Sequence, residues 1–310
     1  MTNAELQKGA PGTRRGGLAW VALAYAAALA VAAALALALA GRHPILVAAV
    51  ADLAATGVVF AFSAVLDNSS LYDPYWSVAP IPIALYWASG PGSALASRGR
   101  QILLLALLCA WGVRLTANWV VRWRGLSDED FRYREIRRRT GKLYWPASFL
   151  SIHLLPTAWV FLALVPAFPA LGGPGRPLGL LDCAAALVAT SAILLEAVAD
   201  LQLRRYLRHR TDPAGILESG LWAVFRHPNY LGEVLFWWGL FLFGLAADPG
   251  WAFAAVGAAA ITCLFAFVSI PWMDRRMLAG HPAWKRHMET TPVLLPRPRR
   301  RGEVSPPRPS

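Results

Sequence analysis

Long apolar runs alternate with short polar segments along most of this chain. The runs cover residues 18–40, 44–65, 75–89, 101–121, 147–169, 178–199, 231–247 and 250–272. A helix needs about 20 apolar residues to cross a bilayer, and most of these runs approach or exceed that length. Only the third and seventh runs are markedly shorter. The pattern predicts an all-α, polytopic helical membrane protein with about seven or eight transmembrane helices.

The composition supports this class of protein. Of the 310 residues, 56% are hydrophobic and 15% are charged, and the mean hydropathy is +0.43. A soluble domain is charged at about a quarter of its positions, which is clearly more than the 15% of this chain. The first apolar run is too long for the core of a signal peptide, so we predict that it is a membrane span.

Polar segments at the two ends divide the chain into three parts. Residues 1–17 are polar and contain glycine, which predicts a mobile leader. Residues 297–310 are rich in Pro and Arg, which predicts a disordered cytoplasmic tail. No tandem repeat divides the remainder, so we expect residues 18–296 to form a single membrane domain.

The basic residues lie mainly on one predicted side of the membrane. If all eight runs cross and the chain starts in the cytoplasm, 25 of the 30 Lys and Arg residues fall in cytoplasmic segments. Four fall on the opposite side, and Arg114 lies within a span. This is the positive-inside pattern, which predicts that both termini are cytoplasmic. The net charge of +12 is therefore a topology signal, and we expect no nucleic-acid partner.

Three cationic segments fall on the predicted cytoplasmic face: residues 122–145, 200–229 and 273–296. Together they are a candidate vestibule for an anionic cofactor. Within the first segment, Ser127-Asp128-Glu129-Asp130 predicts a helix cap and an acidic first turn before the basic run from Arg132 to Lys142.

A polar octet, Arg226 to Glu233, stands directly before the seventh apolar run. A charge at the centre of a membrane helix costs about 2.5–3.5 kcal/mol on insertion scales, so such groups need a partner. Pro228 in a first helical turn is typical of an ordinary helix start. That interpretation gives no reason for Arg226, Asn229 and Glu233. We therefore interpret the octet as a binding site for a polar ligand.

Glu196, Asp200 and Arg204 are spaced i, i+4 and i+8, so they share one face of the predicted sixth helix. Two carboxylates at this spacing repel each other unless a cation or ligand hydroxyl groups satisfy them. They are either a helix-end cluster paired with arginine or contacts to the ribose or amide of a cofactor. Both interpretations stay open from the spacing alone.

Other polar residues within spans allow structural as well as functional interpretations. Arg114 and Asn118 share a helix face, and Arg114 needs a partner such as Glu233 or Asp52. His153 is more typical of a hydrogen-bonded packing residue than of a proton donor. It has no second ligand at metal-binding spacing, and the three cysteines lie in apolar runs, so we expect no metal site.

These motifs resemble one known family. The run from Gly220 to Glu233, followed by Trp237-Trp238-Gly239, resembles bacterial membrane proteins of unknown function grouped with the steroid 5-alpha-reductase C-terminal domain. Further matching segments are Asp73 to Ser77, Glu129 to Tyr133, Glu196 to Gln202 and Pro271 to Pro296. The resemblance covers roughly residues 45–296. The octet alone also resembles isoprenylcysteine carboxyl methyltransferases and phospholipid methyltransferases.

The resemblance implies an NADPH-dependent reductase that saturates a carbon–carbon double bond conjugated to a carbonyl, with a cofactor pocket open to the cytoplasm. The matching cofactor-binding positions are Glu196, Asp200, Arg204, Arg226, His227, Asn229, Tyr230, Lys285 and Arg286. For the general acid we favour Tyr75 over Tyr133 and Tyr230, and Glu233 is the second catalytic candidate. Residues 44–100 lack the Gln-Glu pair of steroid reductases proper, which leaves the substrate open.

Three functions compete at this point. The leading hypothesis is hydride transfer from NADPH to an enone-like lipid. The alternative is an S-adenosylmethionine-dependent methyltransferase of lipids or prenyl groups, in which Arg226, His227 and Glu233 bind the methyl donor. The third is a non-catalytic lipid-binding protein. We expect a lipid-like substrate and membrane lipids as partners, no obligate protein partner, and a place in the bacterial inner membrane.

Overall fold

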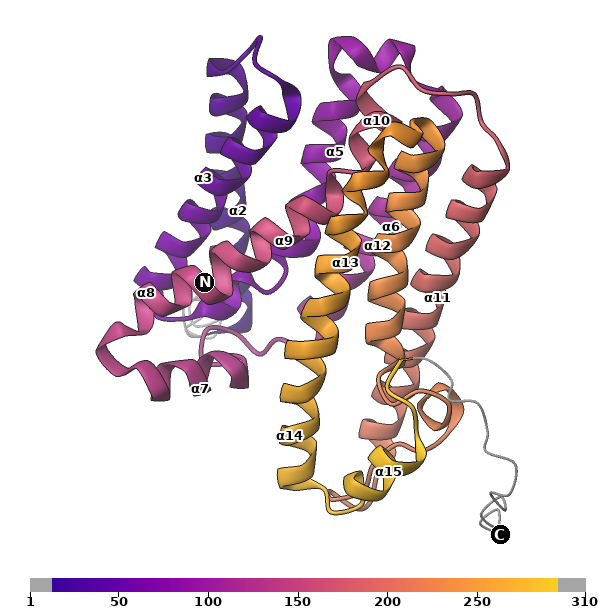
Figure 1. Ribbon diagram of the computed structural model, residues 1–310. Helices are drawn as coiled ribbons and strands as arrows, with labels where there is room; N and C mark the ends of the chain where they lie inside the picture. Colours follow the sequence, from indigo (N-terminus) through magenta and orange to yellow (C-terminus); the bar gives the residue numbers. More distant parts are fainter. Residues whose placement is uncertain (1–12, 295–310) are drawn as a thin grey trace, which may run out of the picture. The chain divides into compact units, whose positions relative to one another are not determined.

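Helices form the regular structure of the computed structural model, which describes residues 13–294 (Figure 1). No strand occurs within those residues. Seven helical stretches are long and apolar enough to cross a membrane: Arg14–Ala38, Pro44–Val65, Arg98–Arg122, Phe131–Leu164, Leu180–His209, Pro228–Ala247 and Pro249–Gly280. The prediction of an all-α, polytopic membrane protein is therefore confirmed. The predicted tail and most of the predicted leader lie outside the described residues.

The chain forms two compact units. Unit 1 consists of Met1–Thr190 and Phe236–Ile261, and unit 2 consists of Ser191–Leu235 and Thr262–Ser310. Ten of the eleven candidate site residues belong to unit 2, and Tyr75 belongs to unit 1.

Unit 1 begins with a helical hairpin. α2 (Arg14–Ala38) and α3 (Pro44–Val65) lie side by side at the indigo end of the chain (Figure 1). The following elements are η1 (Ser69–Tyr72), α4 (Tyr75–Val78), α5 (Pro80–Ser89), η2 (Pro91–Leu95), α6 (Arg98–Arg122), α7 (Phe131–Thr140), η3 (Gly141–Leu143), α8 (Tyr144–Ser148), η4 (Phe149–Leu154), α9 (Leu155–Leu164), α10 (Ala167–Gly172) and the first part of α11 (Leu180–His209). The second half of α12 (Pro228–Ala247), η6 (Pro249–Ala254) and the start of α13 (Ala255–Leu264) complete it.

The predicted third span is helical but broken. α4 ends at Val78 and α5 begins at Pro80, a residue that cannot donate a backbone hydrogen bond. The chain turns immediately after α3, where the Asn68 amide donates to the Ser63 carbonyl at 2.9 Å. At the far end of α5, the Trp87 indole donates to the carbonyl of Pro44, the first residue of α3, at 3.3 Å. α4 and α5 therefore return along α3 toward its first residue.

A buried ion pair secures the end of unit 1 that contains the start of α6. Arg100 is fully buried, and its Nε and Nη2 donate to the two carboxylate oxygens of Asp182 at 2.6 and 2.8 Å. The same guanidinium donates to the carbonyls of Arg176 and Pro177. These bonds join α6 to the start of α11 and to the segment before it. Because every donor has a target, the buried charge is satisfied.

Small residues let the helices of unit 1 approach closely. A Cβ on Gly244 of α12 would overlap the carbonyl of Pro166, and a Cβ on Gly257 of α13 would overlap that of Leu162. Membrane helices pack through such small residues because lipid supplies no hydrophobic force between them.

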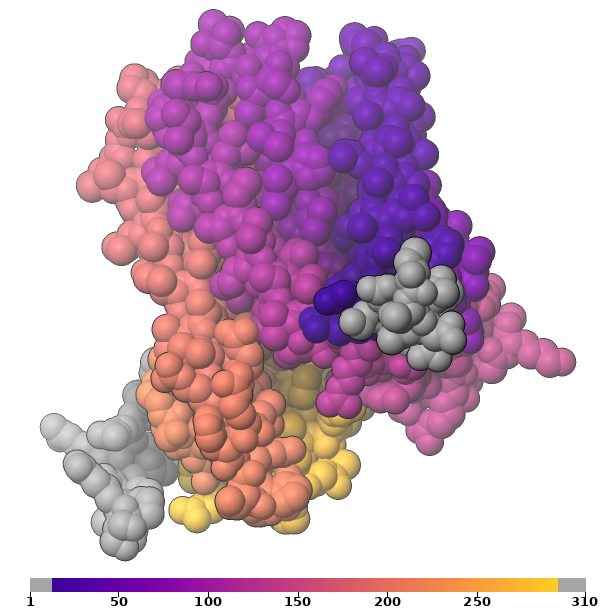
Figure 2. Space-filling view, turned by 180° about the vertical axis from the view of Figure 1, so that it is seen from behind, coloured from indigo at the N-terminus to yellow at the C-terminus, as the bar shows by residue number. Residues whose placement is uncertain are grey.

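Unit 2 contains the second part of α11, η5 (Gly220–Ala223), the start of α12, the π-helical turn η7 (Phe265–Ser269), α14 (Ile270–Gly280) and α15 (Trp284–Thr290). α11 continues to His209, ten residues past the predicted end of that span, and the prediction was too short because it followed hydropathy alone. A helix extends beyond the bilayer when its polar residues suit water, and basic residues in its last turn favour this. The loop after α11 lies at the surface (salmon to orange in Figure 2).

Candidate functional site

The octet forms the entry to α12, as predicted. Pro228 is the first residue of the helix, and Arg226, His227 and Glu233 are all buried. Asn229 and Tyr230 are partly buried. The octet thus places polar groups inside the protein, where a polar group without a hydrogen-bond partner costs the most free energy.

Asp274 on α14 is the main partner of the octet. Its Oδ1 lies 2.9 Å from His227 Nε2 and accepts a hydrogen bond from the Trp284 indole at 3.1 Å. Its Oδ2 lies 3.5 Å from Arg226 Nη2. The carboxylate, itself 6% exposed, therefore joins α12 to α14 and α15. Asp274 was not among the site residues predicted from the sequence, although an acidic residue at the end of the last apolar run indicates a functional position.

Arg226 also holds the segment that follows α15. Its backbone amide donates to the Pro292 carbonyl at 2.9 Å, and Nη1 contacts the Met288 carbonyl at 3.5 Å. The next amide, that of His227, donates to the Val293 carbonyl at 3.4 Å. The octet thus fixes the C-terminal segment through backbone as well as side-chain bonds.

Aromatic rings surround His227. The Tyr230 ring stacks on the imidazole with centroids 5.3 Å apart, and Trp284 meets it edge-on at 5.9 Å. Phe265 also packs against Tyr230, with ring centroids 5.0 Å apart. This packing fixes the imidazole plane, so the bond to Asp274 has one orientation.

The acidic face of α11 packs against the octet. A Cβ on Gly232 would lie 2.8 Å from both the Ala192 carbonyl oxygen and Glu196 Cβ, so α11 and α12 approach as closely as glycine allows. Glu196 and Asp200 are buried, whereas Arg204, one turn further along the same face, is exposed. One helix face thus carries two buried carboxylates and, one turn further, an exposed cation. This arrangement suits a ligand whose hydroxyl groups bind the carboxylates and whose phosphate binds the cation.

The end of that helix face is tied to the loop before the octet. Gln202 Oε1 accepts the Leu221 amide at 3.0 Å, and the Trp222 indole donates to the Ala199 carbonyl at 3.1 Å. Gly220 has φ +62°, and a Cβ there would lie 2.6 Å from Gln202 Nε2. A glycine is therefore required for the loop to return over α11.

α15 carries the two basic candidates nearest the C-terminus. Lys285 and Arg286 are exposed, while the next residue, His287, is buried. His287 Nδ1 lies 3.2 Å from the Thr291 hydroxyl and 3.7 Å from Glu218. Burial lowers the pKa of His287, and it outweighs the opposing effect of Glu218. The folded protein thus resists protonation of this imidazole more than an exposed histidine would.

Exposed cations also surround the site. They are Arg204, Arg205, Arg208 and Arg210 from α11 and its end, Arg275 and Arg276 from α14, and Lys285 and Arg286 from α15. Across residues 13–294, no three His, Cys, Asp or Glu side chains are grouped as a metal site would require.

Tyr75 lies in a separate buried network in unit 1. Its hydroxyl donates to Asp52 Oδ1 at 2.8 Å, so Asp52 has the partner that its position within a span requires. Nearby, Thr157 Oγ1 lies 2.9 Å from Thr56 Oγ1 and 2.8 Å from the Tyr72 hydroxyl. His153 is a packing histidine, with its ring nitrogens at Ser148 and Ser63.

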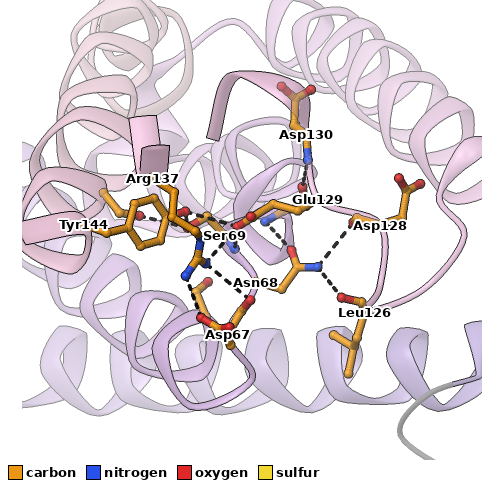
Figure 3. Close-up of polar contacts among 12 residues, drawn as sticks. Asp67, Asn68, Ser69, Leu126, Asp128, Glu129, Asp130, Arg137 and Tyr144 are labelled. Atoms are coloured by element: carbon orange, nitrogen blue, oxygen red, sulfur yellow. Dashed lines mark hydrogen bonds and ion pairs between the residues drawn. The ribbon is translucent and has the colours of Figure 1, made fainter. Parts of the chain in front are cut away.

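The turn after α3 is a second polar cluster of unit 1, shown in Figure 3. Asn68 Nδ2 donates to the carbonyls of Leu126 and Asp128, at 2.7 and 3.2 Å. Glu129 Oε1 accepts the Ser69 amide at 3.0 Å and the Tyr144 hydroxyl at 3.1 Å. These bonds attach the segment before α7 to η1 and α8.

Arg137 closes that cluster from α7. It bonds Asp67 at 2.8 Å and lies over the Tyr144 ring at 3.9 Å (Figure 3). Asp130 caps α7 by accepting the Arg132 amide at 2.8 Å, so the cap lies at the last of the four predicted residues. The prediction of an acidic first turn was wrong, because Asp128 and Glu129 precede the helix. Arg137, a member of the basic run from Arg132 to Lys142, therefore helps to fix the loop.

Asp73, directly after η1, is a carboxyl whose pKa is raised by its surroundings. Its oxygens accept the Tyr133 hydroxyl at 2.6 Å and the Trp119 indole at 3.3 Å. Burial, with repulsion from Asp130, raises the pKa of Asp73 to about 6 against the opposing effect of Arg132.

Comparisons with known proteins give a family but no described activity. The model of a family described as "Protein of unknown function (DUF1295)" matches residues 59–291. An uncharacterized protein of Schizosaccharomyces pombe, C594.04c, is 28% identical over 229 residues, which is 66% of this chain and 66% of that protein. No solved structure matches the chain.

Proposed function

This chain belongs to the DUF1295 family, and from that premise we propose that it is a membrane-embedded reductase. The enzyme uses NADPH to saturate a conjugated carbon–carbon double bond in a lipid or steroid-like substrate. We further propose that it is related to the steroid 5-alpha-reductases and that it resides in the cytoplasmic membrane of a bacterium.

One observation carries the proposal: the cofactor candidates converge in unit 2. Gly232 brings the Glu196 helix against the octet, and Asp274 brings in α14 and α15 with Lys285 and Arg286. Four segments distant in the sequence therefore contribute buried carboxylates and exposed cations to one compact unit. A dinucleotide presents both ribose hydroxyls and phosphates, and this donor set matches both.

The residues present fit the chemistry of NADPH. Glu196 and Asp200 would accept ribose or amide donors, and Arg204, Lys285 and Arg286 would bind the phosphates. Asn229 and Tyr230 would contact the nicotinamide end. Arg226 and His227 already bond Asp274, so they position the C-terminal segment around the ligand as well as lining it.

Bound NADPH would supply a hydride to the β carbon of the conjugated alkene. The enolate would then need a proton at the α carbon, and a hydrogen-bond donor at the carbonyl would stabilise it as it forms. We propose a proton-transfer role for Glu233, which is buried. The Tyr75 hydroxyl donates its one hydrogen to Asp52 within unit 1, so we do not assign the carbonyl donor to Tyr75. Water must be kept from the hydride, and the burial of Glu233 serves that end.

Paired variants on α11 test the cofactor site. Arg204→Ala removes a cation from the Glu196/Asp200 face, whereas Arg205→Ala removes an equally exposed cation that points away from it. We expect Arg204→Ala to weaken NADPH binding about tenfold, as loss of a charged phosphate contact does. Arg205→Ala should bind as the wild type does. Thermal shift of the purified protein against NADPH concentration measures both.

The same assay separates the rival functions. Stabilisation by S-adenosylmethionine without any by NADPH would identify a methyltransferase. Stabilisation by neither NADPH nor S-adenosylmethionine, in a sample that unfolds cooperatively, would support a lipid-binding protein without catalysis. Asn229→Ala and Glu233→Ala should weaken only the true cofactor.

A further inference from the structure

An open groove of about 590 Å³ follows one face of α14 in unit 2. Ala266, Ile270, Asp274 and Leu278 line its length at intervals of four residues. Positions four apart share a helix face, so these residues extend the groove about 18 Å along the axis. Met288 from α15 helps to form the facing wall.

One end of the groove is apolar and open to lipid. Ala266 lies in the π-helical turn η7, and the neighbouring Phe267 and Val268 are 76% and 44% exposed. Such π-turns occur mainly at functional sites, because they displace the helix face locally. This end lies within a stretch that is long and apolar enough to cross the membrane, Pro249–Gly280.

The half of the groove toward the end of α14 is cationic. Arg226 and Asp274 both line it, and they neutralise each other at 3.5 Å. Arg275 is exposed at the rim, where its Nε donates to the Pro271 carbonyl at 3.1 Å. This half of the groove therefore carries one net positive charge, within two turns of the end of the spanning stretch at Gly280.

We propose that this groove is a binding site for an anionic membrane phospholipid. One acyl chain lies along Ile270 and Ala266, and the phosphate meets the guanidinium of Arg275. An amphiphile with an anionic head is the ligand that matches an apolar groove with a cationic end. The Arg-rich segment 297–310 does not match it, because like charges repel. Arg226 lines the groove and also belongs to the proposed cofactor set, but the phosphate contact, Arg275, does not, so the lipid site does not require reductase activity.

The test is lipid binding by the full-length protein, measured by native mass spectrometry with added phosphatidylglycerol or phosphatidylcholine. The wild type should prefer phosphatidylglycerol about fivefold, the factor one arginine near an anionic group contributes. Arg275→Ala should abolish that preference. Arg208→Ala, an exposed cation of α11 outside the groove, should retain it.

Two changes at Leu278, which is 41% exposed and lines the groove next to Arg275, test occupancy of the groove without disturbing the core. Leu278→Trp fills the groove and should reduce binding of both lipids severalfold, whereas Leu278→Ala should keep the headgroup preference. Equal affinity for both lipids in the wild type, or an equal loss in Arg208→Ala, would overturn the proposal. So would stronger lipid binding after truncation beyond residue 296, because the groove would then belong to the chain's own tail.

Discussion

Asp274 shows how one carboxylate can organise a site. It accepts bonds from two rings and faces a guanidinium, all of them buried. A buried charge is tolerated only when its partners are complete, so each group here depends on the others. The octet residues Arg226 and His227 therefore have a structural role in addition to any contact with a ligand.

Replacing Asp274 by alanine should destabilise the protein strongly. The change leaves the buried Arg226 charge without its carboxylate, a loss of about 3–5 kcal/mol for buried pairs. Asp274→Asn keeps an acceptor for Trp284 and should cost less. Thermal unfolding in detergent measures both, with Glu289→Ala, an exposed acid on α15, as the control. An unchanged melting temperature in Asp274→Ala would contradict this role.

His287 should make the protein sensitive to acid. Burial lowers its pKa below the usual 6.5, with Glu218 opposing and Arg226 and His227 reinforcing the shift. Below about pH 6.5 the unfolded chain binds a proton that the folded chain resists, so stability is intact above that pH and falls on acidification. His287→Gln should therefore lose less melting temperature than the wild type between about pH 7.5 and pH 5.5. Equal losses would show that other groups control the acid response.

At the scale of elements, periodicity and caps were enough for much of the fold. The hydropathy runs located the spans, and the run from Ser127 to Asp130 predicted a cap for α7 because capping depends on local sequence. The extension of α11 to His209 was not predictable from hydropathy, since polar residues continue a helix without lengthening its apolar run. The partners of Asp52 and Asp274 were missed because each pairing joins residues far apart in the chain.

The contact between α11 and α12 depends on Gly232. A methyl group there would lie 2.8 Å from two atoms of α11, one of them a backbone oxygen that cannot move alone. Gly232→Ala should destabilise the protein by about 1–3 kcal/mol, the usual cost of overpacking, and weaken cofactor binding. Gly280→Ala meets no atom within 4 Å and should be nearly neutral in the same melting experiment. Equal effects of the two changes would show that the contact is not tight.

At the scale of the whole molecule, the broken helix α4/α5 decides the topology. If α4 and α5 cross the membrane, the basic segments 122–145 and 200–229 fall on the same side as Arg14 and Arg15 at the start of α2. Without that crossing, the segment after α6 would change sides. The positive-inside pattern and the return of α5 to Pro44 agree on the first arrangement.

Cysteine labelling tests that topology. After replacement of Cys109, Cys183 and Cys263, single cysteines at Ser127 and Thr211 should resist an impermeant maleimide applied to intact cells. A cysteine at Ser93, in η2, should react, because that turn follows the crossing by α4 and α5. Reaction at Ser127 but not at Ser93 would mean that α4 and α5 do not cross.

The central claim is that unit 2 binds a dinucleotide, and a direct titration is its most direct test. Full-length protein in detergent or nanodiscs is titrated with NADPH, NADH and S-adenosylmethionine, and binding is followed by isothermal calorimetry. We predict saturable binding of NADPH, weaker binding of NADH because it lacks one phosphate for the basic rim, and no binding of S-adenosylmethionine. Saturable binding of S-adenosylmethionine with none of NADPH, in protein shown to be folded, would contradict the central claim.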